Sequence, residues 1–330
     1  MKKKIVSGVL MAGAMALALA GCSSSDATTS AGASGAPAAG KLITVGFAQT
    51  GSESGWRAAN TDSMKAAFSE ANGFKLIFNA ADNKPEAQVA AVHSFINQGV
   101  DAIVIAAVVT TGWDDVLKEA QAAKIPVILE DRTIDADPSL YAAWFGDDFL
   151  AEGKAAGEWA AKTFGSTPTN MVVLEGTTGS GPAVDRATGF DAAIKGTGIV
   201  KIASQTGNFT RADGKTVMEG FLQKYGKTIN LLFAQNDDMG LGALDAIEAA
   251  GLVPGKDIQI VTIDATHDGL QALADGKFNY VVECQPLLGD QVAKTVKDVL
   301  AGKTVEKKQY GVDGAFDQAA AKAALPTRKY

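Results

Sequence analysis

From Lys41 to the C-terminus, short apolar segments of strand length alternate with segments whose apolar residues recur at helical spacing. This alternation is typical of a parallel β-sheet with crossover helices. The clearest strand lies in Ile125–Arg132, where an apolar run that includes Pro126 stops abruptly at three charged residues. A parallel strand is buried on both faces and therefore lacks the polar alternation of a half-exposed strand. The sequence thus predicts an α/β fold with polar side chains at strand ends.

The alternation restarts after residues 144–148, which predicts two similar doubly wound parallel-sheet lobes. A chain of 330 residues is long enough for two such cores. Too few residues follow Cys284 to form a third lobe, so we expect the tail to return to the first. We therefore assign residues 41–145 with 285–330 to the N-terminal lobe and residues 146–284 to the C-terminal lobe, joined by a multi-strand hinge.

The first 40 residues are not expected to join this fold. Basic Lys2–Lys4 precede apolar Ile5–Ala20, which is too short for a stable membrane span and is typical of a secretory signal. Leu19–Cys22 resembles the lipobox of bacterial lipoproteins, which implies removal of residues 1–21 and a diacylglycerol on Cys22. The alternative is an ordinary signal peptide that happens to contain a cysteine. Residues 22–40 lack the apolar content to fold and read as a flexible linker.

Polar clusters follow eight of the predicted strands. They are Gln49–Arg57, Asp82-Asn83, Glu130–Arg132, Glu175–Gly181, Gln205–Arg211, Gln235–Asp238, Asp264–His267 and Glu283–Gln285. One such loop would merely be solvated, but in an open α/β sheet ligands bind beyond the carboxyl ends of the strands. Carboxylates, amides and arginines hydrogen-bond to hydroxyls, and Trp56 and Phe209 could pack against a sugar ring. The pattern predicts a site for a small polar ligand.

The sequence does not match the motifs of nucleotide-binding, metal-binding or catalytic sites. The glycine-rich segment 176–181 does not match the dinucleotide fingerprint, and the two Gly-Lys-Thr tripeptides lack the earlier glycine of a P-loop. His93 and His267 lack metal-ligand spacing, and no nucleophile elbow is found. Glu130 and Asp131 are adjacent in a strand, so they should face opposite ways and not act as a glycosidase pair. We expect no enzymatic activity, metal or cofactor.

The net charge and the cysteine content argue against a nucleic-acid-binding protein and against a disulfide-bonded one. The net charge of −7 becomes more negative once Lys2–Lys4 are removed, so no nucleic-acid surface is expected. With Cys22 lipidated, Cys284 has no partner and no disulfide is expected.

Several strand-end motifs resemble a known family. They are Ser52–Arg57, Gln98–Ala102, Asp131-Arg132, Phe209–Arg211, Asn236–Met239 and Ile263-Asp264. Together they are similar to the ribose/galactose-type substrate-binding proteins of ABC importers, the type I periplasmic binding proteins, over Lys41 to the C-terminus. Ser52–Arg57 and Asn236–Met239 resemble most the branch that binds galactofuranose and fructose. The resemblance implies two lobes on a three-strand hinge that close on a monosaccharide.

The resemblance also implies ligand-binding roles for ten residues. They are Glu53, Trp56, Arg57, Asp131 and Arg132 in the first lobe, Arg186, Phe209, Asn236 and Asp264 in the second, and Glu283 in the last hinge strand. The chain departs from the ribose proteins at Cys284, where they have a glutamine. Other readings remain open at this point: Trp56 as a helix core residue, and Arg186 with Asp264 as a surface ion pair. Arg211 is not included among the predicted ligand-binding residues, because the alternative interpretation of a charged side chain after Phe209 is that it is simply solvated.

We therefore expect an extracytoplasmic, lipid-anchored and monomeric solute-binding protein. It would bind a monosaccharide, with fructose or galactofuranose favoured over other hexoses and pentoses, and present it to an ABC permease and its ATPase. One alternative is a sugar sensor that signals to a membrane receptor. Another is a sugar-responsive regulator of the same fold, which would need an N-terminal DNA-binding module where this chain has a signal peptide.

Overall fold

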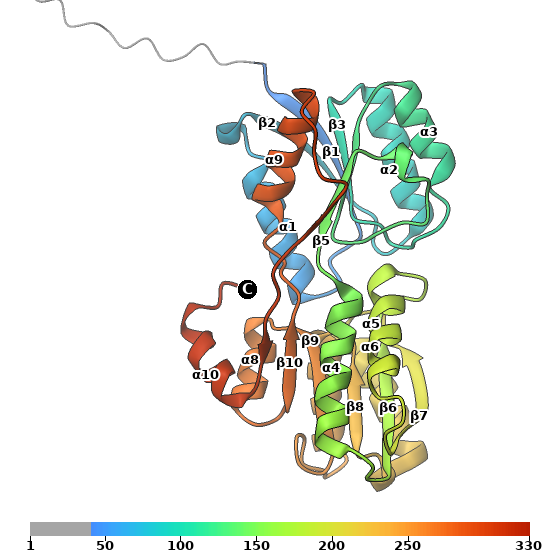
Figure 1. Ribbon diagram of the computed structural model, residues 1–330, viewed down its shortest axis with the longest axis vertical. Coiled ribbons are helices and arrows are strands. Elements are labelled where there is room, and N and C mark those ends of the chain that lie inside the picture. Colours follow the sequence, from blue (N-terminus) through green and yellow to red (C-terminus); the bar gives the residue numbers. More distant parts are fainter. Residues whose placement is uncertain (1–40) are drawn as a thin grey trace, which may run out of the picture. The chain divides into compact units, whose positions relative to one another are not determined.

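The computed structural model describes residues 41–330. The predicted signal peptide over residues 1–21, the predicted lipidation site Cys22 and the predicted linker over residues 22–40 lie outside the described residues. The described part forms two α/β lobes, each on one six-stranded sheet (Figure 1). This confirms the predicted fold class. No helix within residues 41–330 combines the length and the apolarity needed to cross a bilayer.

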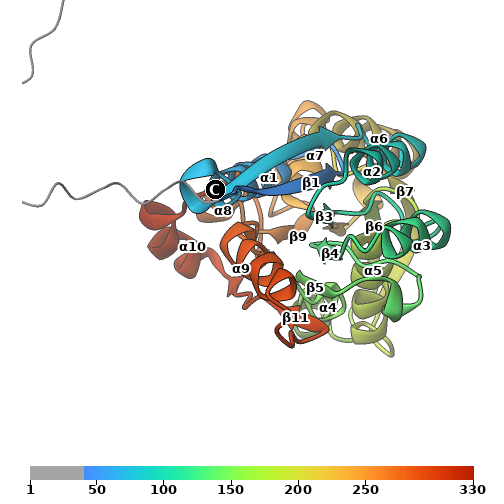
Figure 2. The same ribbon diagram turned by 90° about the horizontal axis from the view of Figure 1, so that it is seen from above.

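The first lobe is built on a parallel sheet with the strand order β11-β5-β4-β3-β1-β2. Its strands are β1 (Ile43–Gln49), β2 (Phe74–Ala80), β3 (Ala102–Ile105), β4 (Val127–Glu130), β5 (Ala143–Gly146) and β11 (Lys308–Tyr310). Its helices are α1 (Gly55–Ala67), α2 (Pro85–Gln98), α3 (Asp114–Ala122) and α9 (Gly289–Leu300), with short 3₁₀ turns at Glu70–Asn72 and Pro138–Leu140. Helices α2 and α3 share one apolar core with the sheet, and α1 and α9 share the other (Figure 2). Strands β3 and β4 are buried throughout, which explains their uninterrupted apolar runs.

The second lobe repeats this plan with the strand order β12-β10-β9-β8-β6-β7, in which only β12 is antiparallel to its neighbour. Its strands are β6 (Thr169–Glu175), β7 (Ile199–Thr206), β8 (Leu231–Ala234), β9 (Gln259–Asp264), β10 (Tyr280–Glu283) and β12 (Ala315–Phe316). Its helices are α4 (Phe149–Phe164), α5 (Gly181–Ala193), α6 (Arg211–Tyr225), α7 (Asp237–Ala249), α8 (His267–Ala274) and α10 (Gln318–Ala324), with 3₁₀ turns at Gly226–Thr228 and Leu325–Thr327. Helices α4 and α5 pack on one face of the sheet, and α6, α7 and α8 on the other.

Helices α4 and α5 approach each other closely because glycine occupies their contact. A Cβ atom at Gly153 of α4 would lie 2.1 Å from the carbonyl oxygen of Arg186 in α5. A Cβ atom at Gly189 of α5 would lie 2.2 Å from the carbonyl oxygen of Leu150 in α4. The two glycines therefore determine how deeply α5, and Arg186 with it, sits against α4.

The chain crosses between the lobes three times: after β5, after β10 and after β11. The third crossing corrects the predicted division of the chain. Residues 285–310 do return to the first lobe through α9 and β11, but β12 joins the second sheet and α10 packs on α8. The prediction that all of residues 285–330 belong to the first lobe is therefore wrong for the last part. A two-residue antiparallel edge strand carries no periodicity that a sequence could show.

Candidate functional site

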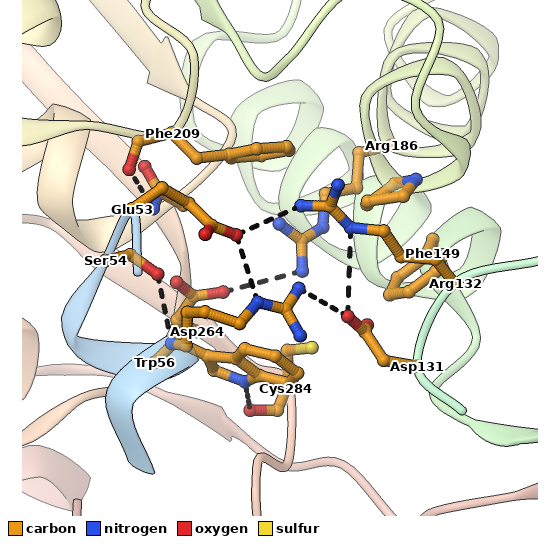
Figure 3. A pocket seen from close by; sticks show the side chains of 13 residues that line it. Glu53, Ser54, Trp56, Asp131, Arg132, Phe149, Arg186, Phe209, Asp264 and Cys284 are labelled. Atoms are coloured by element: carbon orange, nitrogen blue, oxygen red, sulfur yellow. Dashed lines mark hydrogen bonds and ion pairs between the residues drawn. The ribbon is translucent and has the colours of Figure 1, made fainter. Parts of the chain in front are cut away.

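A cavity lies where the carboxyl ends of the strands of both lobes meet (Figure 3). Its empty volume, including the part open to solvent, is about 290 Å³. It is lined by Glu53, Ser54, Trp56, Arg57, Asp131, Arg132, Phe149, Pro182, Arg186, Phe209, Asn236, Asp264 and Cys284. The position beyond the strand ends is the one that open α/β sheets use for ligands.

The first turn of α1 supplies three lining residues around a conventional helix start. Ser54 is the N-cap, and its side chain accepts a hydrogen bond from the N–H of Arg57. Trp56 donates from its indole N–H to the carbonyl oxygen of Cys284 at 2.7 Å, which joins α1 to the second crossing. The cap therefore fixes where the helix begins, and the indole bond fixes the ring at the edge of the cavity.

The charged side chains of the first lobe form one buried network. Arg57 donates to Glu53 at 3.0 Å and to Asp131 at 2.5 Å, and Arg132 donates to Glu53 at 3.3 Å. Burial alone would lower the pKa of Arg57, but the carboxylates of Asp131 and Glu53 outweigh it and raise that pKa. Burial would likewise raise the pKa of Glu53, but Arg57 and Arg132 keep it below its usual value. The charged forms of Arg57 and Glu53 are therefore favoured, and their ion pair holds both side chains in place.

Asp131 occupies a backbone conformation that side chains rarely adopt. Its φ angle is +57°, directly after β4 ends. The turn directs the side chain into the cavity, whereas the preceding Glu130 is buried away from it and accepts from Asn60 at 3.3 Å. Burial and the neighbouring charge of Asp131 raise the pKa of Glu130 to about 8. As predicted from their adjacency, these two carboxyl groups face different surroundings.

Arg186 is the central residue of the cavity wall that the second lobe contributes. It donates to Glu152 of α4 at 2.7 Å, to the carbonyl oxygen of Gln235 at 2.6 Å and to Asp264 at 3.5 Å. The side chain of Asn236 caps α7 and donates to the carbonyl oxygen of Phe209 at 3.1 Å. Burial raises the pKa of Asp264 despite the opposing effect of Arg186. Arg186 and Asp264 do form an ion pair, but a buried one at the cavity rather than on the surface.

Aromatic rings and guanidinium groups lie against one another around the cavity. The guanidinium carbon of Arg57 lies 4.7 Å from the centroid of the Trp56 ring, and that of Arg186 lies 5.4 Å from the Phe149 ring. The contact of Arg132 with Phe209, at 5.4 Å, spans the two lobes. The rings thus provide flat apolar walls while the arginines keep their polar edges available.

The formal charges of the lining side chains cancel. Three are guanidinium groups and three are carboxyl groups: Arg57, Arg132, Arg186, Glu53, Asp131 and Asp264. Two buried polar atoms in this set, Glu53 Oε2 and Arg132 Nε, have no hydrogen-bond partner within residues 41–330. Because a buried polar atom without a partner is costly, the site is chemically prepared for an uncharged ligand with several hydroxyl groups.

Nine of the ten predicted ligand-binding residues line this cavity, and Glu283 does not. The carboxylate of Glu283 accepts from the N–H of Gly314 at 2.9 Å and from the hydroxyl of Tyr330 at 2.8 Å, and it pairs with Arg328. Glu283 therefore lies outside the cavity, where its carboxylate contacts the tail of the chain. Neighbouring residues of a strand point to opposite faces, so Cys284 faces the cavity and Glu283 the tail of the chain.

Four lining residues were not among the predicted ones: Ser54, Phe149, Pro182 and Cys284. Ser54 and Cys284 lie inside polar clusters that the strand-end rule had selected. Phe149 follows the end of β5 and could have been found by the same rule. No comparable signal marks Pro182, which lines the cavity because α5 begins there.

Asp147, Glu152 and Cys284 form a buried group at the hinge whose ligand atoms lie within 4.8 Å of one another. Such a set could in principle hold a metal ion. However, Glu152 is already paired with Arg186, and the thiol of Cys284 donates to Asp147 at 3.4 Å. Burial and the nearby Glu152 and Asp147 raise the pKa of Cys284, so the thiol form is favoured over the thiolate that metals require. The donor chemistry fits a hydrogen-bonded acid cluster better than a metal centre.

Comparison with known proteins agrees with this geometry. A sequence model described as a periplasmic binding protein domain matches residues 45–304. The galactofuranose-binding protein YtfQ of Escherichia coli (strain K12) is 48% identical over 264 residues, which cover 78% of this chain and 83% of that protein. The fructose import binding protein FruE of Bifidobacterium longum (strain NCC 2705) is 40% identical over 337 residues, covering 99% of each.

A solved structure shows the same fold with a sugar bound. The crystal structure of a protein from Mycobacterium smegmatis in complex with β-D-fucofuranose is 56% identical in sequence, with a TM-score of 0.84. The similarity covers 87% of this chain and 95% of that one.

Proposed function

The chain belongs to the periplasmic binding protein family, a family of binding proteins rather than enzymes, and on that premise we propose that it is the sugar-binding component of an ABC importer. The ligand is a monosaccharide in its five-membered ring form, with galactofuranose and fructose favoured and other hexoses and pentoses next. It binds between the lobes at the nine lining residues that the sequence singled out. The observation that carries this proposal is the charge-balanced, aromatic-walled cavity.

Each wall has a role toward such a ligand. Asp131 with Arg57 and Arg132 binds adjacent hydroxyls from the first lobe, since an arginine fork and a carboxylate can each hold two oxygens. Arg186, Asp264 and Asn236 do so from the second lobe. Trp56, Phe149 and Phe209 pack against the C–H faces of the ring. Because groups from both lobes bind one ligand, the sugar stabilises the closed form by hinge closure.

The sequence motifs and the family support a proposed cellular setting. The protein is monomeric, lies outside the cytoplasm and is anchored to the outer face of the cell membrane by lipid on Cys22. The closed, loaded form presents both lobes to a membrane permease driven by an ATPase. Neither nucleic acid nor a cofactor takes part.

The first test is a thermal-shift panel on residues 41–330, since residues 40–330 form a structural unit of their own. The panel contains D-fructose, D-galactose, L-arabinose, D-ribose and D-xylose, together with the methyl β-D-galactofuranoside and galactopyranoside, which differ in ring size alone. A ligand at a hundred times its Kd adds about 2.7 kcal/mol of stability, which raises Tm measurably. We expect a large shift with fructose or the furanoside and none with the pyranoside. A flat panel would contradict the proposal.

A further inference from the structure

One hydrogen bond joins the two lobes beside the cavity without involving any cavity-lining side chain. The backbone N–H of Gly55, the first residue of α1, donates to Asp238 Oδ2 at 2.7 Å. Asp238 is the second residue of α7 in the other lobe, and only 8% of it is exposed. The donor lies between Ser54 and Trp56, and the acceptor lies two residues after Asn236. Gly55 is therefore a direct neighbour of two cavity-lining residues, and Asp238 lies two positions from a third.

The chemistry of the contact makes it strong. The first N–H groups of a helix have no partner within the helix, and a carboxylate there also interacts favourably with the helix dipole. In α1 the side chain of Ser54 satisfies the N–H of Arg57, but the N–H of Gly55 is satisfied by the second lobe. A charge-assisted hydrogen bond of this kind is about twice as strong as a neutral one.

Asp238 is held in position by Arg211. The guanidinium Nε of Arg211 lies 3.4 Å from Asp238 Oδ1, and its Nη2 donates to Asp268 at 3.1 Å. Burial raises the pKa of Asp238, and the Gly55 N–H and Arg211 oppose that rise. Arg211 is thus more than a solvated charge, because it orients the carboxylate that reaches across to the first lobe.

We propose that Asp238, oriented by Arg211, is a latch that holds the closed form by accepting the Gly55 N–H, so that it slows release of the sugar without touching it. The inference rests on the proposed function. When the lobes open to release the sugar, α1 separates from α7 and this hydrogen bond must break. When the open form binds a sugar, the hydrogen bond has not yet formed, so it does not affect the binding step. The latch therefore acts on the dissociation rate.

Two variants remove the bond from opposite sides. Asp238→Ala removes the acceptor. Gly55→Pro removes the donor and places a ring carbon against the carboxylate; proline is well tolerated at the first helical position, and Ser54 already has the extended conformation that a residue before proline prefers. With D-fructose as the probe, stopped-flow tryptophan fluorescence should show about a tenfold faster dissociation for each variant and an unchanged association rate.

A matched control and a double variant sharpen the test. Asp268→Asn removes the other partner of Arg211 but no contact with the first lobe, so the dissociation rate should not change. The double variant Gly55→Pro/Asp238→Ala should release the sugar no faster than either single variant, because both remove the same bond. An unchanged dissociation rate in Asp238→Ala, or additive effects in the double variant, would overturn the latch.

Failure of the proposed sugar-binding function would give a different experimental result from failure of the latch. If the unaltered chain bound none of the panel sugars, that function would be contradicted. The latch would then be judged on the ligand-free protein by small-angle X-ray scattering. A larger radius of gyration in Asp238→Ala than in Asp268→Asn would support it, and equal radii would overturn it.

Discussion

At the scale of single residues, the site depends on buried charges that satisfy one another. Asp131 accepts from Arg57 at 2.5 Å and lies 3.8 Å from Arg132, so one carboxylate orients two guanidinium groups. Its φ of +57° is tolerated by asparagine and aspartate better than by most residues. The residue identity therefore serves both the backbone turn and the chemistry of the cavity.

Asp131→Asn should weaken sugar binding by about tenfold to a hundredfold, because hydrogen bonds to charged groups contribute roughly 1.5–3 kcal/mol. Asparagine keeps the shape and suits the left-handed backbone, so the fold should persist. Asp131→Ala should abolish binding and also lose stability to the strained backbone. Titration calorimetry and circular dichroism measure the two effects, and unchanged affinity in both variants would remove Asp131 from the site.

Glu283→Gln should separate stability from binding. Its carboxylate bonds to Gly314, Arg328 and Tyr330 on the side away from the cavity, so its charge-assisted bonds stabilise the tail. We expect the free energy of unfolding to fall by about 1–3 kcal/mol while the Kd for sugar is unchanged. Glu306→Gln, an exposed position, is the control for the change in charge. A weakened Kd without loss of stability would restore Glu283 to the ligand site.

At the scale of elements, helix packing places the second-lobe side chains. Helix α5 carries Arg186, and its depth against α4 is set by Gly153 and Gly189. On the first-lobe side, the N-cap Ser54 starts α1 so that Trp56 and Arg57 fall in its first turn. The geometry of the cavity is thus transmitted from helix ends and helix contacts rather than from the loops alone.

Gly153→Ala should destabilise the protein and weaken sugar binding together. Alanine is the better helix former, but its Cβ would meet the Arg186 carbonyl and force α4 and α5 apart, a cost of about 1–3 kcal/mol. The matched control is Gly220→Ala in α6, where nothing lies within 4 Å, and it should stabilise by roughly 0.5–1 kcal/mol. Urea unfolding measures the stability of both variants. A Gly153→Ala variant more stable than the unaltered chain would show that α4 and α5 accommodate the added Cβ atom.

At the scale of the whole described molecule, the three crossings act as one hinge. The N–H of Gly311 donates to the carbonyl oxygen of Gly146 at 2.8 Å, which joins the third crossing to the first. The N–H of Gln285 donates to Asp313 at 3.1 Å, and the thiol of Cys284 donates to Asp147, so the second crossing contacts both others. Acids gather here: burial and the charge of Glu152 raise the pKa of Asp313 to about 7.

This raised pKa predicts that the hinge weakens as pH rises. An unfolded aspartate loses its proton near pH ~4, whereas folded Asp313 keeps it to about 7. The stabilising contribution is therefore complete below pH ~4 and is lost as pH rises through about 7. Asp313→Asn mimics the protonated acid, so its stability relative to the unaltered chain should increase from pH 4 to pH 7 and then level off.

Urea unfolding of both proteins at several pH values measures the effect, with Glu306→Gln as the exposed control. Other buried acids titrate in the same range, including Asp237, so the difference between the two proteins is the quantity that reports on Asp313. A difference that does not change with pH would mean that Asp313 has the same pKa in the folded and unfolded states.

The two-lobe fold and most of the cavity were predictable from the sequence, because local sequence patterns determine them. Apolar runs and helical periodicity predicted the two parallel-sheet lobes, since burial on both faces of a parallel strand leaves a continuous apolar stretch. Eight of the nine predicted residues that line the cavity lie in strand-end clusters, because parallel strands deliver their carboxyl ends to one edge of a sheet, whereas Arg186 was implied by the family resemblance. These inferences needed only the order of residues along the chain.

Tertiary structure alone decided what depends on contacts between distant segments. The two-residue strand β12 exists only because β10 offers an edge to pair with, so the tail could not be divided from sequence. Whether Glu283 or Cys284 faced the cavity depended on the register of the last hinge strand, because a shift of one residue exchanges the two faces. The bond from Asp238 to Gly55 joins residues 183 positions apart, and no local pattern encodes such a pairing.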